Sequence, residues 1–101
     1  MQKIINRKLY DTETAKRIGD YSYDYPNSFR YFSEELYCKT TGEFFLYGEG
    51  GPASKYCEYV AENRQRSGSR IVPLSIEEAK EWVEQYCSAD TYIELFGPVE
   101  E

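Results

Sequence analysis

The chain has 101 residues, 41% of them hydrophobic and 17% aromatic, and its formal net charge is −6. It contains three cysteines and no histidine, which excludes the commonest general base of enzymes and a four-ligand zinc site made of cysteine and histidine. No apolar run approaches the ~20 residues of a transmembrane helix and no signal-peptide segment follows Met1, so we expect one cytoplasmic domain, residues 1–101, without membrane association.

The first part of the chain predicts a strand followed by a short helix. Residues 2–10 alternate apolar and polar side chains imperfectly, a pattern that indicates a β-strand. Asp11 or Thr12 can cap a helix that runs over residues 14–18. Gly19 would end this helix, because glycine readily adopts the conformation that follows a last helical turn.

Tyrosines alternate with polar residues over residues 20–28, which end in a Pro-Asn turn. This period of two predicts a strand with a half-exposed aromatic face. Exposed tyrosine supplies the amphipathic contact area that protein interfaces favour. The residues predicted to contact a partner here are Tyr21, Tyr23 and Tyr25.

Residues 35–47 carry the strongest strand signal, since two apolar and aromatic arms flank the sequence Lys-Thr-Thr-Gly. Gly42 can supply the positive φ of a hairpin turn. The second arm is apolar on both faces over residues 44–47, which is typical of a central strand. We therefore expect a β-hairpin whose second strand lies inside a sheet.

The middle of the chain gives weaker signals. The segment 48–52 is rich in glycine and interrupts the strand pattern, and residues 53–61 could form one or two helical turns. Residues 62–69 are predicted to form a polar, basic loop. Residues 70–74 are long enough only for an edge strand, which their proline ends.

The clearest helix begins after Ser75, which forms a capping-box pattern with Glu78. Apolar residues then recur with a period of 3.6, and Trp82 is the expected core anchor. This stripe consists of Ile76, Ala79, Trp82, Val83, Tyr86 and Cys87. Asp90 is expected to cap a final short helix over residues 92–96. Together these elements predict an α+β fold: a small antiparallel sheet of four to five strands with one main C-terminal amphipathic helix packed on a face.

The acidic residues are concentrated towards the end of the sequence. Residues 71–101 contain eight acidic residues and one basic residue, whereas residues 1–70 contain eleven basic and ten acidic residues. Helical spacing predicts a row of acids on the outer sides of the two helices, namely Glu77, Glu81, Glu84, Asp90 and Glu94. Such a row can present carboxylates where a nucleic-acid-binding groove expects phosphates. The alternative is an ordinary solvated face, although such faces usually mix both signs of charge.

This charge distribution favours a basic protein partner, because an acidic surface repels nucleic acid itself. The basic residues between positions 55 and 70 are too few to give the positive surface typical of nucleic-acid-binding proteins. We therefore expect no direct binding of DNA.

The three cysteines, Cys38, Cys57 and Cys87, are widely spaced and form no CxxC motif. They are expected to be reduced and unliganded, with Cys87 buried. Since histidine is missing and no metal-ligand or cofactor motif is present, the sequence predicts a non-enzymatic protein that uses no cofactor and no metal.

Three segments together resemble a known group of proteins. They are Leu9–Ala15 (LYDTETA), Thr41–Gly51 (TGEFFLYGEGG) and Ile71–Trp82 (IVPLSIEEAKEW), and the resemblance extends over most of the chain. The group consists of small acidic proteins carried on plasmids, phages and integrative elements of Firmicutes, and some similar proteins are anti-CRISPR inhibitors of type II RNA-guided nucleases. The resemblance transfers no catalytic motif and no functional residues. It implies a large basic partner with positively charged channels for its nucleic acids.

The preferred hypothesis is therefore a stoichiometric inhibitor that occupies a basic nucleic-acid-binding surface of a type II CRISPR nuclease or of its guide-RNA complex. The alternative is an adaptor or regulator of a mobile element that binds another DNA-processing protein. A third hypothesis, from a different class, is a small nuclease that uses carboxylates and a divalent metal. One-to-one titration would indicate the inhibitor, whereas turnover and metal dependence would indicate the enzyme.

Overall fold

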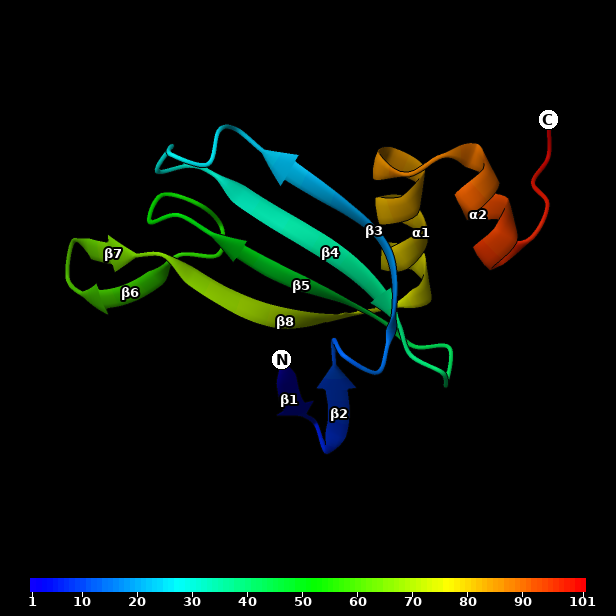
Figure 1. The fold of residues 1–101 in the computed structure, drawn as a ribbon, viewed down its shortest axis with the longest axis horizontal. Coiled ribbons are helices and arrows are strands. Elements are labelled where there is room, and N and C mark those ends of the chain that lie inside the picture. The colour runs from blue at the N-terminus through cyan, green and yellow to red at the C-terminus, as the bar shows by residue number, and fades with distance from the viewer.

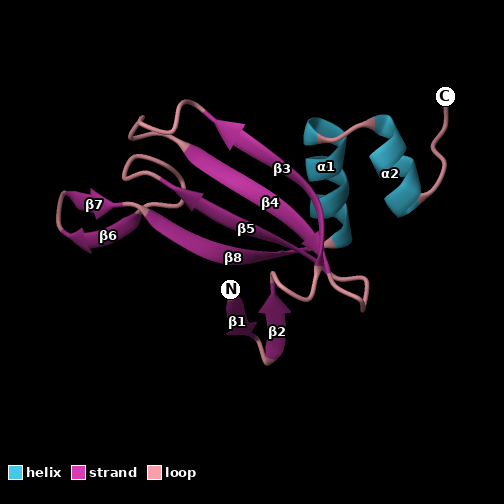
Figure 2. Ribbon diagram, viewed as in Figure 1, coloured by secondary structure: helices cyan, strands magenta, loops and turns pink.

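The computed structural model describes all residues, 1–101, and shows an α+β fold built around a four-stranded antiparallel sheet (Figures 1 and 2). In spatial order the strands of this sheet are β3 (Lys16–Tyr23), β4 (Phe32–Cys38), β5 (Phe44–Gly50) and β8 (Gly68–Leu74). The helices α1 (Ile76–Tyr86) and α2 (Ala89–Phe96) follow β8 and lie at one end of the sheet. The predicted fold class is confirmed, with α1 packed on one face of the sheet.

The hairpin predicted over residues 35–47 is confirmed as β4 and β5, which pair over seven residues. Gly42 lies in the turn with a φ of 92°, a value that glycine adopts without the steric cost of a side chain. β5 lies between β4 and β8, and its Phe44, Phe45 and Leu46 are all buried, as expected of a central strand. β8 is the predicted edge strand, although it begins earlier than residue 70.

The N-terminal segment forms a hairpin where the sequence predicts one strand. β1 (Gln2–Ile5) and β2 (Lys8–Asp11) pair around Asn6 and Arg7, whose φ values are 51° and 67°. Two consecutive positive φ values make the tight turn that suits the right-handed twist of paired strands. The alternation over residues 2–10 correctly indicated extended backbone but did not predict the turn. Arginine is an unusual residue at positive φ, so Arg7 gave no turn signal.

Two predicted helical segments are wrong. Residues 14–18 contain a turn and the start of β3, and seven residue pairs join β3 to β4. Bonds to a neighbouring strand therefore outweigh the local capping signal. Residues 53–61 contain a turn and β6 (Glu58–Ala61), which pairs with β7 (Arg64–Arg66). The predicted loop at 62–69 thus contains β7 and the start of β8, and this small hairpin lies at the end of the sheet away from the helices (Figure 1).

Both helices begin at a serine cap. The Ser75 hydroxyl accepts a hydrogen bond from the Glu78 backbone N–H at 3.1 Å, and the Glu78 carboxylate accepts one from the Ser75 N–H at 2.8 Å. This is the predicted capping box. The cap of α2 is Ser88 and not Asp90, because the Ser88 hydroxyl accepts from the Thr91 N–H at 3.2 Å. Asp90 instead lies in the first turn, where its negative charge interacts favourably with the positive end of the helix dipole.

Ser75→Ala is expected to lower the free energy of unfolding by about 1 kcal/mol, the usual contribution of an N-cap serine. The substitution leaves the Glu78 N–H without its side-chain acceptor. Urea denaturation measures the effect, with Ser67→Ala as the control because Ser67 is exposed and caps no helix. Equal stability of the two variants would show that the capping box contributes nothing.

The sheet carries a hydrophobic cluster on each face. The cluster on the helix side consists of Leu36, Phe44, Leu46, Ala79, Trp82 and Val83. The cluster on the other side consists of Tyr10, Tyr37, Phe45 and Ile71. Successive residues of β4 and β5 alternate between the two clusters because strand side chains alternate between faces. The helices thus cover one face and the β1–β2 hairpin covers the other. Ile76, predicted to join the helix stripe, is exposed because it stands in the first turn of α1.

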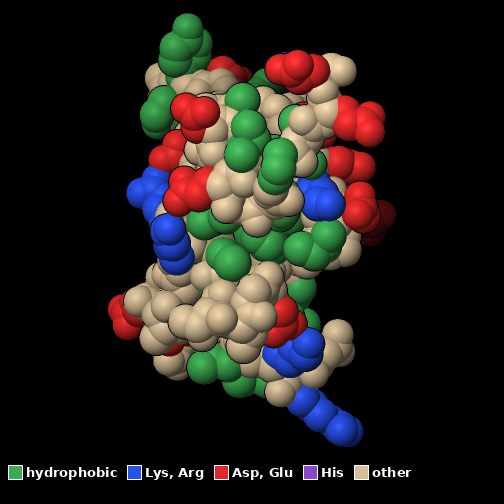
Figure 3. Space-filling model, turned by 90° about the vertical axis from the view of Figure 1, so that its right-hand side faces the viewer, with side chains coloured by type: hydrophobic (Ala, Val, Ile, Leu, Met, Phe, Trp, Pro, Cys, Tyr) green, Lys and Arg blue, Asp and Glu red, His purple; other side chains and the backbone are tan.

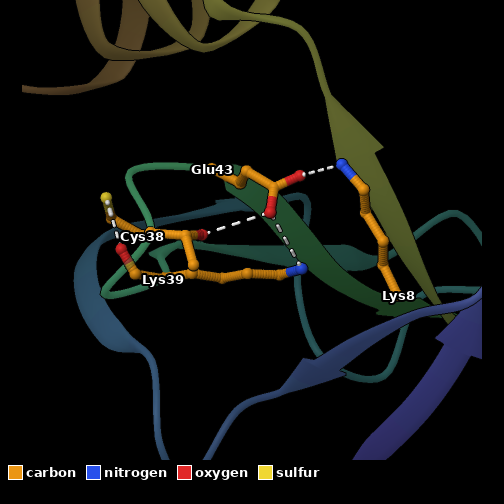
Figure 4. Close-up of polar contacts among 5 residues, drawn as sticks. Lys8, Cys38, Lys39 and Glu43 are labelled. Carbon is orange, nitrogen blue, oxygen red and sulfur yellow. Dashed lines mark hydrogen bonds and ion pairs between the residues drawn. The ribbon is translucent and has the colours of Figure 1, made fainter.

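An ion-pair cluster joins the N-terminal hairpin to the β4–β5 turn (Figure 4). Lys8 Nζ lies 2.7 Å from one carboxylate oxygen of Glu43, and Lys39 Nζ lies 3.6 Å from the other. The hydrogen bond from Lys8 is the main reason that the pKa of Glu43 is lowered. The Lys39 ammonium also lies over the Tyr10 ring, 3.6 Å from its centroid. Polar contacts therefore supplement the apolar packing of this hairpin.

A candidate protein-binding face on the C-terminal helices

The structure places the five predicted acidic residues on the solvent side of the two helices. Glu77, Glu81 and Glu84 follow one another at helical spacing on α1, and Asp90 and Glu94 do so on α2. All five side chains are exposed, and together they are called the acidic face below. Figure 3 views the molecule from the end that carries the helices and shows acidic side chains grouped around hydrophobic ones in its upper half.

The charges of the acidic face are not compensated within the protein. None of its five carboxylates takes part in an ion pair. Lys80, the one base of residues 71–101, lies towards the Phe96 ring, 5.8 Å from its centroid. The acidic residues elsewhere that do pair with Lys or Arg are Asp20, Glu34, Glu35, Glu43 and Glu58. The helical end of the protein therefore carries exposed negative charge that no ion pair neutralises.

A shallow apolar groove lies beside the acidic face, between the end of α1, α2 and the C-terminal segment. Its volume is about 360 Å³. The residues that line it are Glu84, Cys87, Ser88, Ala89, Tyr92, Ile93 and Val99. Cys87, predicted to be buried, is only half-buried because it stands at this open end of α1. We call this feature the interhelical groove.

Of the three tyrosines predicted as contact residues, Tyr21 and Tyr23 lie on one face of β3, where both contact the Phe32 ring, and Tyr25 lies beyond the strand. Tyr21 is half-buried and stacks on Tyr86 of α1, with ring centroids 3.9 Å apart, so it helps to join β3 to the helix. Tyr23 stacks on Phe32 at 5.4 Å and is 45% exposed. Tyr25 lies in the loop beyond β3, which ends at Tyr23. The next residue, Asp24, has a φ of 67°, and its carboxylate accepts hydrogen bonds from Tyr25 N–H and the Ser28 hydroxyl.

A buried carboxylate that the sequence did not single out lies on the helix side of the sheet. Glu34 of β4 is only 2% exposed. It accepts hydrogen bonds from Trp82 Nε1 at 3.1 Å and from the Tyr56 hydroxyl, and Lys55 Nζ lies 2.8 Å away. Burial by itself would raise the pKa of Glu34, but the bonds from Lys55, Tyr56 and Trp82 outweigh it, so the pKa is lowered. Burial and the neighbouring carboxylate raise the pKa of Tyr56.

Gly48 makes room for this buried network. A Cβ atom at Gly48 would lie 2.0 Å from Cζ of Tyr56, so only glycine lets the tyrosine ring lie against β5. Gly48 is the residue of β5 that pairs with Glu34 of β4. An interior glycine in an apolar strand is a sequence signal for such a close approach, whereas nothing local distinguishes Glu34 from its neighbour Glu35.

The polar groups of this network satisfy one another inside the protein. A general base that works near neutral pH needs a raised pKa, whereas the pKa of Glu34 is lowered and three donors already surround its carboxylate.

The free cysteines are all half-buried, and no group of three or more His, Cys, Asp or Glu residues could hold a metal ion. Neither helix is long and apolar enough to cross a membrane.

No model of a known protein family matches this chain, and no match is found among curated proteins or solved structures.

Proposed function

We propose that this protein is a non-enzymatic binding module that uses the acidic face to occupy a basic surface of a nucleic-acid-binding protein. The observation that carries the proposal is the set of five exposed carboxylates without an ion pair. Such a surface gains favourable electrostatic contacts when it meets a positive patch, and it repels nucleic acid.

The spacing of the charges supports competition with nucleic acid. Glu77, Glu81 and Glu84 are separated by four and three residues on α1. With the helical rise of 1.5 Å per residue, α1 presents a negative charge about every 5 Å along its axis, compared with about 3.4 Å along one DNA strand. A groove lined with lysine and arginine for phosphates can therefore accept this helix in their place.

The partner that we propose first is a type II RNA-guided nuclease. Such nucleases hold guide and target strands in positively charged channels and read a short duplex motif with arginines. Three sequence segments resemble small acidic mobile-element proteins, some similar members of which inhibit such nucleases, and the charge distribution agrees with this class. Under this proposal the protein acts by occupancy at one-to-one stoichiometry.

The test is cleavage of a matched DNA target by the guide-loaded nuclease with increasing amounts of this protein. Inhibition should be complete near molar equivalence and should weaken as salt is raised, because screening shortens the reach of the charges. No inhibition of several type II nucleases at large molar excess would overturn this partner class. A complex that forms without loss of cleavage would instead support the adaptor hypothesis. Metal-dependent turnover of DNA by this protein alone would support the hypothesis that it is itself a small nuclease.

The double reversal Glu81→Lys with Glu84→Lys is expected to weaken binding at least tenfold, as an order of magnitude. Single alanine substitutions are less informative, because one exposed charge contributes at most about 1 kcal/mol. The matched control is Glu13→Lys with Glu62→Lys, which changes the net charge equally at exposed glutamates that lie outside the helices and make no ion pair. Equal losses in both variants would show that net charge, and not the acidic face, determines binding.

A further inference from the structure

The interhelical groove presents aliphatic side chains to solvent. Ile93 is 45% exposed and Val99 is 58% exposed, and both line the groove. Tyr92 and Cys87 contribute further apolar surface and are half-buried. A volume of about 360 Å³ is at the lower end of the range for ligand sites. The groove therefore offers room for an apolar group of modest size.

One carboxylate lines this apolar surface, and two more lie on the adjacent side of α2. Glu84 lines the groove itself. On α2, Asp90 and Glu94 each follow a groove residue, Ala89 and Ile93, and point about 100° away from it around the helix axis, so they lie on the side of α2 next to the groove. All three carboxylates are exposed, and none makes an ion pair. A group that enters the groove therefore passes uncompensated negative charge.

These surroundings select among the possible occupants. Ligand sites usually bury most of a small molecule, whereas the exposed walls of Ile93 and Val99 would leave it largely in contact with water. A second copy of this chain, docked through the same groove, would bring the acidic side chains of both copies into one interface, and like charges repel. A basic segment of a protein that also carries an apolar side chain is complementary to both parts of this surface. Its cations meet the carboxylates, and its apolar side chain enters the groove.

We infer that the interhelical groove receives an apolar side chain from a basic segment of the protein partner, flanked by lysine or arginine residues that meet Glu84, Asp90 and Glu94. The inference rests on the proposed function, because it assumes a basic protein partner. It adds that recognition combines a hydrophobic anchor with charge, which is the arrangement of a buried core and a polar rim seen in protein interfaces.

The probes are two fluorescent peptides of equal length and equal lysine content that differ only in leucine or serine at the central position. Fluorescence polarisation at fixed ionic strength measures their affinities for the full chain. The leucine peptide is expected to bind about tenfold more tightly, the gain from burying one aliphatic side chain. Ile93→Ser should abolish this preference. Ile76→Ser is the matched control, because Ile76 is a helical isoleucine of similar exposure, 49%, outside the groove.

The outcomes separate this inference from the proposed function. Equal affinity of the two peptides, with both weakened by the Glu81→Lys and Glu84→Lys reversal, would overturn the groove and leave the acidic face intact. Affinities that do not respond to the reversal would overturn the proposed function. Binding of the leucine peptide should shift the NMR signals of Ala89, Ile93 and Val99 in the unmodified protein, which makes the result independent of variant folding. Self-association that Ile93→Ser abolishes would instead show a second copy in the groove and overturn the inference.

Discussion

Trp82→Ala is expected to lower the free energy of unfolding by about 3–5 kcal/mol, the usual cost of removing a large aromatic side chain from a core. Trp82 is 7% exposed and belongs to the helix-side cluster with Leu36 and Val83. Its ring also packs edge-on against Tyr86, with centroids 5.1 Å apart. Because small domains are stable by only about 5–15 kcal/mol, this variant should be partly unfolded at moderately elevated temperature.

The measurement is urea or thermal denaturation followed by far-ultraviolet circular dichroism, since Trp82 is the only tryptophan and its fluorescence is lost in the variant. Trp82→Phe is the informative companion, because it keeps an aromatic ring in the core but removes the Nε1–H that bonds to Glu34. Its stability should lie between those of the parent and Trp82→Ala. A Trp82→Ala variant that melts like the parent would show that this ring does not anchor α1.

Elements with a strong local signal could be predicted from the sequence. The β4–β5 hairpin depends on Gly42 between two apolar arms, and α1 depends on the Ser75–Glu78 capping box followed by an apolar stripe. In both cases the residues that determine the structure lie within a few positions of one another. Their physical meaning is therefore visible before any tertiary contact is known.

The small hairpins could not be predicted, because their signals are either unusual or supplied by a partner strand. The β1–β2 turn places Arg7 at positive φ, where glycine or asparagine is the expected residue. The side chains of β6 and β7 are all exposed, so no alternation of buried residues marks these strands. Pairing between the two strands, including the ion pair of Arg66 with Glu58, takes the place of burial.

One part of the candidate site could likewise be predicted from the sequence, and other parts could not. Exposure of Glu77, Glu81 and Glu84 follows from helical spacing and could be predicted. The interhelical groove depends on the direction that α2 takes after its N-cap. The structure places this cap at Ser88, whereas the sequence predicted it at Asp90. The buried network depends on residues far apart in the chain: Tyr56 lies 22 positions from Glu34, and Trp82 lies 48.

Glu34→Leu is expected to lower the free energy of unfolding by about 2–6 kcal/mol. The substitution leaves two buried donors, Trp82 Nε1–H and the Tyr56 hydroxyl, without an acceptor, and each such group costs about 1–3 kcal/mol. The matched control is Glu35→Leu, the neighbouring glutamate of the same strand. Its ion pair with Arg17 is partly exposed and its hydrogen bond from the Tyr37 hydroxyl is long, 3.3 Å, so their loss should cost about 1 kcal/mol, less than the loss in Glu34→Leu.

The pH dependence of stability gives a second readout for Glu34. Because its pKa is lowered on folding from the ordinary value of 4.5, the unfolded chain takes up this proton at a higher pH than the folded protein does. The stabilisation is therefore complete above pH 4.5 and is lost as the pH falls through the folded pKa. Between pH 6 and pH 3, as an approximate range, the parent should lose more stability than Glu34→Leu does. Parallel curves for the two proteins would show that the folded and unfolded chains bind this proton equally.

A double-mutant cycle shows whether the orphaned hydroxyl is the cause of the loss. In the parent, Tyr56→Phe removes the hydroxyl that donates to Glu34 and should cost about 1 kcal/mol. In the Glu34→Leu background the same change removes a buried donor that has lost its acceptor, so it should be neutral or stabilising. Replacing both partners by apolar groups is often nearly neutral, whereas removing one partner is not. Equal effects of Tyr56→Phe in the two backgrounds would mean that Tyr56 and Glu34 do not stabilise one another, and that the loop carrying Tyr56 lies against Gly48 through ring packing alone.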